Sequence, residues 1–181
     1  MNKKTTYWVV LLWIFLSRGY DAYNSILYTP DLAHEANPLV SIGGISSWST
    51  LLIILGILSL YVVYSYTLSV FRPMDLFPRE KGYSFSEFTA YIYTGKKGHW
   101  TDLLYKFPKD LRRFNHYMGR LMPPCLVFAG IISTVMWILL NNAQWYREVH
   151  TAFGVYLVLI IGIILLGYTW LRSEYRKYQG L

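Results

Sequence analysis

The sequence predicts an all-α membrane protein with four transmembrane helices, interfacial amphipathic helices on the cytoplasmic side and both termini inside. Hydrophobic residues make up 54% of the 181 residues and charged residues only 15%, whereas soluble domains contain about 25% charged residues. Apolar stretches of about 20 residues recur along the chain, and such a stretch is long enough to cross the hydrocarbon core. Lys and Arg gather in the segments between these stretches, which orients a membrane protein.

The first predicted span covers residues 6–28. Its apolar part is short and follows Lys3 and Lys4, as in a signal peptide. The residues around Arg18 offer no cleavage site between small residues, and the helical pattern continues beyond them, so we expect an uncleaved span. Pro30 ends this helix, because proline lacks the backbone N–H and clashes with the preceding turn.

Three longer apolar stretches predict spans at 48–71, 121–141 and 150–171. We expect Pro123 and Pro124 to open the third span, and residues 143–149 to form a tight turn between the third and the fourth. Two pairs of small residues at four-residue spacing would let helices pack closely. These pairs are Ser65 with Ser69 and Ala129 with Ser133.

Residues 72–119 form the large polar segment of what we predict to be a single transmembrane domain, 1–181. Ser84 and Glu87 have the spacing of a capping box, which opens a helix that Gly95 ends. Two more short helices are expected at 100–107 and 108–120. Aromatic and Leu residues alternate there with Lys and Arg, a pattern typical of amphipathic helices that lie on a membrane surface.

The positions of the 17 Lys and Arg residues predict the topology. Two precede the first span, ten lie between 72 and 120, and three follow the fourth span, whereas Arg18 lies within a span and Arg147 in a loop on the other side. Because the basic side is cytoplasmic, segments 31–47 and 143–149 are expected outside the cell. The protein is then a multi-pass protein of the bacterial inner (plasma) membrane.

The composition also restricts the partners. The net charge of +7 is explained by this topology and by contacts with membrane lipids, so no nucleic acid is expected as a partner. Cys125 is the single cysteine, which excludes an intrachain disulfide and a thiolate metal cluster.

The most informative residues are Arg18, Asp21 and Asn24, which share one face of the first predicted span. A charged side chain in a span is unfavourable by roughly 2.5–3.5 kcal/mol unless it is paired or hydrated, so this face must turn toward other helices or a water-filled cavity. With Asn37 in the following loop, they are our candidate ligand-binding residues. The plain alternative is an Arg18–Asp21 pair within the helix, or hydration near the outer surface.

A metal site is a second interpretation of the same region. Asp21, His34 and His150 would bind a divalent metal such as zinc, and Glu35 would be the general base that activates a bound water. The chain contains no His-Glu-x-x-His motif. The alternatives are a solvated loop for His34 and Glu35, a turn built by Asn37 and Pro38, and a helix cap or interface role for His150.

Asp21, followed by Glu35-x-Asn37-Pro38-Leu39, resembles a family of small bacterial integral membrane proteins of unknown function. The resemblance covers about residues 7–70 and implies a fold and a location, but no activity. The long segment 72–119 departs from the compact form of that family. A loose similarity to membrane hydrolases that gather Asp and His near one membrane face assigns no residue.

Three functions follow from the sequence. The first is a non-enzymatic protein with a polar pocket open to the extracytoplasmic face, which binds a lipid headgroup, an ion or a partner subunit. The second is a metal-dependent membrane hydrolase, and the third is an accessory subunit of a larger membrane complex. Bound zinc beside an unliganded Glu35 would indicate the enzyme, whereas an Arg18–Asp21 pair that fills the pocket would indicate the binding protein.

Overall fold

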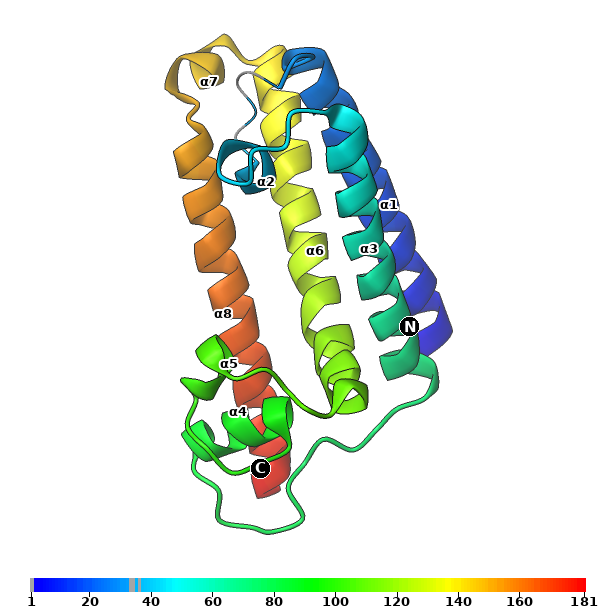
Figure 1. The fold of residues 1–181 in the computed structure, drawn as a ribbon, viewed down its shortest axis with the longest axis vertical. Helices are drawn as coiled ribbons and strands as arrows, with labels where there is room; N and C mark the ends of the chain where they lie inside the picture. The colour runs from blue at the N-terminus through cyan, green and yellow to red at the C-terminus, as the bar shows by residue number, and fades with distance from the viewer. Residues whose placement is uncertain (1, 33–34, 36) are drawn as a thin grey trace. The chain divides into compact units, whose positions relative to one another are not determined.

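The computed structural model describes residues 2–32, 35 and 37–181, and all of the regular structure in them is helical (Figure 1). This confirms the all-α prediction. The helices are α1 (Lys3–Tyr28), α2 (Pro38–Ser41), α3 (Trp48–Phe71), α4 (Phe85–Thr94), α5 (Asp102–Tyr105), α6 (Leu111–Asn142), α7 (Gln144–Val149) and α8 (Ala152–Gln179).

Three of the described helices, α3, α6 and α8, are long and apolar enough to cross a membrane. Their length and composition indicate a membrane-embedded protein. Helix α1 is continuous over 26 residues, but it is not one of the three. Its apolar character is interrupted by four charged side chains: Lys3, Lys4, Arg18 and Asp21.

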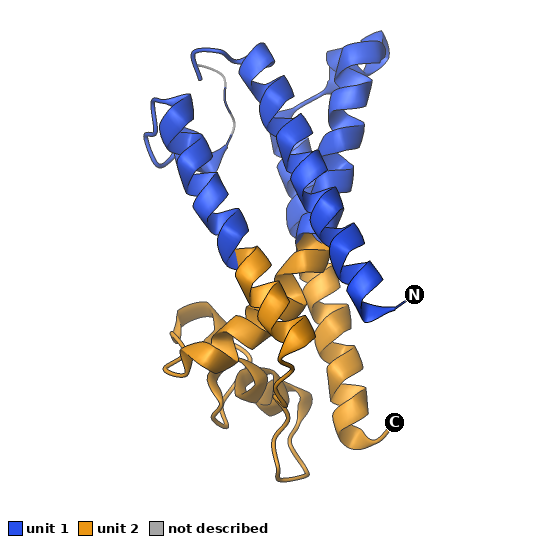
Figure 2. Cartoon of the chain, turned by 90° about the vertical axis from the view of Figure 1, so that its right-hand side faces the viewer, with its two compact units in different colours: residues 1–61, 126–163 blue, residues 62–125, 164–181 orange. Residues whose placement is uncertain are grey.

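The chain divides into two compact units (Figure 2). Unit 1 contains residues 1–61 and 126–163, and unit 2 contains residues 62–125 and 164–181. The boundaries between the units fall within α3, α6 and α8. The predicted single domain therefore stays a prediction.

In unit 1, α1 lies along α6 and runs in the same direction. A series of contacts joins the two helices in rising order: Trp13 with Val127, Ser17 with Gly130, Arg18 with Ser133, Asp21 with Trp137, and Asn24 with Asn141. Gly130 allows the closest approach, because a Cβ atom there would lie 2.3 Å from Ser17 Oγ. The polar face of α1 is thus turned toward α6.

In unit 2, the segment that follows α3 folds around a small core. Leu76, Phe88 and Ile92 pack there with Tyr117 of α6 and Leu171 of α8. The Ser84–Glu87 capping box and the left-handed Gly95 at the end of α4 are both as predicted. The expected helices at 100–107 and 108–120 are wrong in extent: the first is only the four-residue α5, and the second is the beginning of α6.

Pro123 and Pro124 lie inside α6, so the expectation that a helix begins at them is wrong. The predicted beginning of the span stays a prediction. Pro123 has no N–H, which leaves the Gly119 carbonyl four residues earlier without its helical donor. Ser69 of α3 donates to that carbonyl through its hydroxyl, at 3.0 Å. A neighbouring helix therefore supplies the hydrogen bond that Pro123 removes from α6.

The predicted turn at 143–149 contains the short helix α7. Arg147 of α7 donates to the carbonyls of Leu140 and Asn141 in the last turn of α6, the second at 2.7 Å. A guanidinium in this position satisfies carbonyls that have no partner within the helix. This local role accounts for the one basic residue in a segment expected outside the cell.

Candidate functional site

The Arg18 and Asp21 side chains form a polar contact between α1 and α6 in unit 1. Arg18 Nη1 lies 3.4 Å from Asp21 Oδ2, and Arg18 Nη2 donates to Ser133 Oγ at 2.8 Å. The Trp137 indole donates to Asp21 Oδ1, also at 2.8 Å. Both charged side chains keep about 30% of their surface exposed. Neither charge is isolated, and α6 supplies a partner to each.

Asn24 continues this contact one turn further along α1. The Asn141 side chain donates to Asn24 Oδ1 at 3.0 Å, and Asn24 itself donates to the Tyr20 carbonyl at 2.8 Å. Asn24 is buried, unlike Arg18 and Asp21. The three polar residues predicted on α1 therefore meet three residues on α6 at four-residue spacing: Ser133, Trp137 and Asn141.

Glu35 and Asn37 lie in the segment between α1 and α3. Glu35 accepts from the Asn37 backbone N–H at 3.0 Å and from the Thr29 hydroxyl at 3.4 Å. The Asn37 side chain accepts from the Leu39 N–H at 3.0 Å and caps α2. Asn37 thus builds the turn, and its role as a ligand-binding residue stays a prediction.

Tyr156 of α8 lies within electrostatic range of two carboxylates. The negative charges of both Glu35 and Asp21 act on its phenol, so each carboxylate lies within electrostatic range of Tyr156 in unit 1. Tyr156 is one of 17 tyrosines in the chain, and nothing in its sequence position distinguished it. Its place in the site comes from the structure alone.

The predicted metal ligands are only partly described. His34 lies outside the described residues. His150 follows α7 as its capping residue, and its Nδ1 atom lies 3.4 Å from the Tyr146 hydroxyl. Among the residues with described positions, no group of three or more His, Cys, Asp or Glu side chains could hold a metal ion. A metal site with Asp21, His34 and His150, and Glu35 as its base, stays a prediction.

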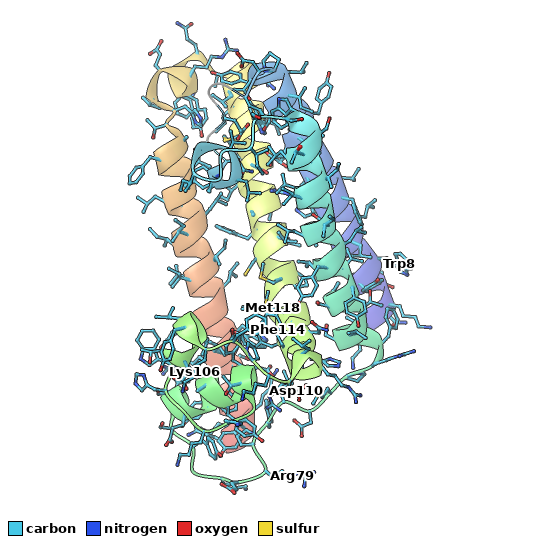
Figure 3. The ribbon with its side chains drawn as sticks, viewed as in Figure 1. Trp8, Arg79, Lys106, Asp110, Phe114 and Met118 are labelled. Atoms are coloured by element: carbon cyan, nitrogen blue, oxygen red, sulfur yellow. The ribbon has the colours of Figure 1, made fainter. Side chains whose placement is uncertain are left out.

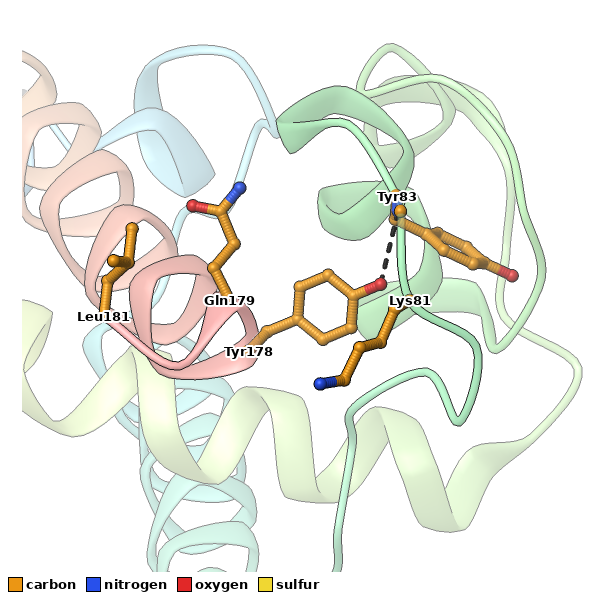
Figure 4. Close-up of a pocket in the computed structure, with 6 residues that line it drawn as sticks. Lys81, Tyr83, Tyr178, Gln179 and Leu181 are labelled. Carbon is orange, nitrogen blue, oxygen red and sulfur yellow. Dashed lines mark hydrogen bonds between the residues drawn. The ribbon is translucent and has the colours of Figure 1, made fainter.

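Unit 2 contains a shallow pocket of about 330 Å³, shown in Figure 4. Its lining includes Lys81, Tyr83 and Tyr178. The Tyr178 hydroxyl accepts from the Tyr83 N–H at 3.2 Å and donates to the Glu80 carbonyl at 2.7 Å. These bonds tie the end of α8 to the loop before α4. The lining residues therefore have a structural role, which accounts for them without any bound ligand.

Comparison of the chain with protein-family models, with curated proteins and with solved structures found no match. The resemblance carried by Asp21 and residues 35–39 therefore stays an expectation. Any function must be argued from the geometry of the polar residues in unit 1.

Proposed function

We propose that the chain is a four-span protein of the bacterial inner membrane that binds a cationic group at its extracytoplasmic side. Helix α6 is long and apolar enough to cross a membrane. Contacts between Trp13–Val127 and Asn24–Asn141 hold α1 along α6 through residues 127–141. A helix held in parallel along a spanning helix shares its depth, so α1 crosses the membrane beside α6.

The binding residues form what we call the outer polar cluster: Arg18, Asp21, Asn24, Glu35 and Tyr156. Its charge supports a cationic ligand. Asp21 and Glu35 bring two carboxylates, and Arg18 brings one guanidinium. Glu35 forms no ion pair with any other described residue. One negative charge therefore remains in excess at a site expected near the membrane surface, where a cation would compensate it.

The observation that carries this proposal is the loose Arg18–Asp21 pair. Its 3.4 Å separation is long for a charge-assisted hydrogen bond, which is usually about 2.7–2.9 Å. Trp137 holds the other carboxylate oxygen at 2.8 Å. Asp21 is thus fixed in position by a neutral donor, while the oxygen that faces Arg18 keeps the capacity to accept from a second cation.

Three sources could supply the cationic group: the ammonium of a phosphatidylethanolamine headgroup, a metal ion, or a Lys or Arg side chain of a partner subunit. All three would use the same carboxylates. Thermal unfolding of the purified full chain in detergent, followed by circular dichroism, separates the first two. The additions are phosphatidylethanolamine, phosphatidylglycerol, Mg²⁺ and Zn²⁺, each tested alone.

We expect phosphatidylethanolamine or one of the metal ions to stabilise the native chain, by about 2.7 kcal/mol at a hundredfold excess over the dissociation constant. Asp21→Asn and Glu35→Gln should lose this stabilisation, whereas Glu148→Gln, an exposed carboxylate change on α7, should keep it. Stabilisation by phosphatidylglycerol alone, or equal stabilisation of all four proteins, would contradict a cation site. Bound zinc that is lost in His150→Ala would instead support the hydrolase.

The accessory-subunit function has its own test. A protein that co-purifies with the native chain, but not with Asp21→Asn, would identify the cationic group as a side chain of a partner. A co-purifying protein that Asp21→Asn retains would place the partner elsewhere on the surface and leave the cluster to a lipid or ion.

A further inference from the structure

Residues 100–111 of unit 2 carry apolar side chains that the core of the unit does not use. Leu104, Tyr105 and Phe107 are 75%, 70% and 75% exposed. Trp100 and Leu111 are each at least half exposed. These five side chains form what we call the aromatic edge. Their concentration within twelve residues is unlike the scattered apolar residues of an ordinary surface, and it marks an interaction site.

The aromatic edge has a defined conformation. The buried Asp102 accepts from the Tyr105 hydroxyl at 2.9 Å and forms an ion pair with Lys106 at 2.9 Å. Pro108 is fully buried, and Asp110 accepts from the Arg113 N–H at the start of α6. Polar contacts and one buried proline thus fix the backbone, while the apolar side chains between them point away from the core.

The charge around the aromatic edge is positive. Between residues 96 and 113 the chain has six Lys and Arg residues but only two acidic residues, Asp102 and Asp110. Lys109 and Arg112 are exposed beside the apolar side chains. Both acidic groups are engaged, Asp102 by Lys106 and Asp110 by a backbone N–H. Of the six cations, Lys97 and Lys106 form ion pairs and Arg113 is buried. The positive charge available to a partner therefore comes from Lys96, Lys109 and Arg112, which are exposed.

Figure 1 shows where α5, which carries Leu104 and Tyr105 of the aromatic edge, lies within unit 2. In Figure 1, α5 is drawn above α4 along the vertical direction in which α8 descends to the C-terminus. In Figure 3, Lys106 lies on this side of the unit and Arg79 at the opposite end. The α8 residues near Ile164 are apolar, whereas Arg172, Arg176 and Lys177 follow near its C-terminus. The edge thus lies toward the apolar end of the helix.

We propose that the aromatic edge inserts into the headgroup region of an anionic phospholipid surface, in the same membrane that the apolar helices cross. Trp, Tyr and Phe with Lys and Arg are the side chains that favour this region, because their apolar parts enter the acyl boundary while their cations meet lipid phosphates. A protein partner is less well matched, because exposed Lys is depleted at protein interfaces. This inference uses the membrane placement of the chain and is independent of the outer polar cluster.

The test places a nitroxide spin label at position 104 in the full chain, with Leu104→Cys on a Cys125→Ser background. The matched control is Arg79→Cys, an exposed position of the same unit outside the edge. Collisions with oxygen, which concentrates in lipid, and with a water-soluble nickel complex are measured in phosphatidylcholine vesicles with and without phosphatidylglycerol. Circular dichroism of each labelled protein verifies that it is folded.

We expect the label at 104 to report a lipid environment and the label at 79 a water environment. Phosphatidylglycerol should raise the ratio of inserted to free edge by about fivefold for each cation engaged, and Lys109→Gln with Arg112→Gln should remove that gain. Equal access of the nickel complex to positions 104 and 79 in both vesicles would overturn the proposal. A label at 104 that is shielded from both oxygen and the nickel complex would overturn it too, because a protein surface then covers the edge.

Discussion

Arg113 illustrates how one buried side chain organises unit 2. Its Nε atom donates to the carbonyls of Tyr91 and Ile92 at 3.1 and 3.2 Å, and its Nη2 atom donates to the Leu76 carbonyl. It thereby closes the last turn of α4 and holds the loop before α4 against α6. The guanidinium also lies 4.7 Å from the centre of the Tyr91 ring.

We therefore predict that Arg113→Gln destabilises the protein by about 1–3 kcal/mol for each carbonyl left buried without a donor. Arg112→Gln is the matched control, because Arg112 is exposed and surface changes usually stay within about 0.5 kcal/mol. Denaturant unfolding followed by circular dichroism measures both. Equal unfolding midpoints for the two variants would show that the Arg113 hydrogen bonds do not hold the unit together.

Asp102 predicts a pH dependence of stability. The hydrogen bond from the Lys106 ammonium holds the pKa of the Asp102 carboxyl below its ordinary value; burial opposes this shift, and the Tyr105 hydroxyl adds to it. Because the pKa is lower in the folded state, Asp102 stabilises the fold above its unfolded pKa of about 3.9. That contribution is lost as the pH falls through the folded value.

The measurement is the difference in unfolding midpoint between the native chain and Asp102→Asn, from pH 7 down to about pH 3. The native chain should be the more stable at pH 7, and the difference should shrink below pH 4. The pKa of Glu87 is also lowered in the folded protein. Glu87 is present in both proteins, so its contribution cancels in the difference between their unfolding midpoints. A difference that stays constant over this range would reject the assignment to Asp102.

At the scale of the elements, α6 depends on α3 where its prolines interrupt the helical hydrogen bonds. Ser69→Ala removes the donor to the Gly119 carbonyl and should cost about 1 kcal/mol. Ser59→Ala is the control, because the Ser59 hydroxyl donates to a carbonyl of its own helix, that of Leu55. Thermal unfolding in detergent compares the two, and an equal loss in both would contradict this role of Ser69.

Gly119→Ala tests the contact between α3 and α6 by adding a methyl group where the two backbones lie close together. A Cβ atom at this position would lie 2.0 Å from the Ser65 carbonyl oxygen, a backbone atom that cannot move away alone. We expect a loss of about 1–3 kcal/mol, as in overpacked cores. Gly56→Ala, with no atom within 4 Å of the added Cβ, should be tolerated. If both changes were tolerated, α3 and α6 would not be in close contact there.

Elements that are marked by local sequence signals could be predicted, whereas elements that depend on tertiary partners could not. The Ser84–Glu87 box and Gly95 act within a few residues, so their pattern sufficed. The start of α6 could not be located, because Pro123 and Pro124 usually open a helix. The hydrogen bond that Pro123 removes is replaced here by Ser69, more than 50 residues earlier. The contact depends on helix packing, which periodicity does not reveal.

The same distinction applies to the candidate site. Arg18, Asp21 and Asn24 were recognisable because charged and amide side chains are rare in apolar helices. Their partners on α6 were harder to find, although Ser133, Trp137 and Asn141 recur every four residues. Small and aromatic residues are common in spans, so this spacing did not stand out. Tyr156 had no signal in the sequence at all.

At the scale of the whole molecule, the central claim is that α1 crosses the membrane with its polar face toward α6. Three helices satisfy the criteria of length and apolar character without α1. With three spans the two ends of α1 would lie on the same side, and with four they would lie on opposite sides. The position of the N-terminus relative to the segment before α3 therefore distinguishes the two topologies.

The most direct measurement is cysteine labelling with a membrane-impermeant maleimide, on a Cys125→Ser background. Thr5→Cys lies in the first turn of α1, and Ile42→Cys lies in the segment between α1 and α3. Lys81→Cys marks the segment after α3, and all three positions are exposed. With four spans, position 42 reacts in intact cells, whereas positions 5 and 81 react only after permeabilisation. Labelling of both 5 and 42 in intact cells would contradict the account, because α1 would then not cross the membrane.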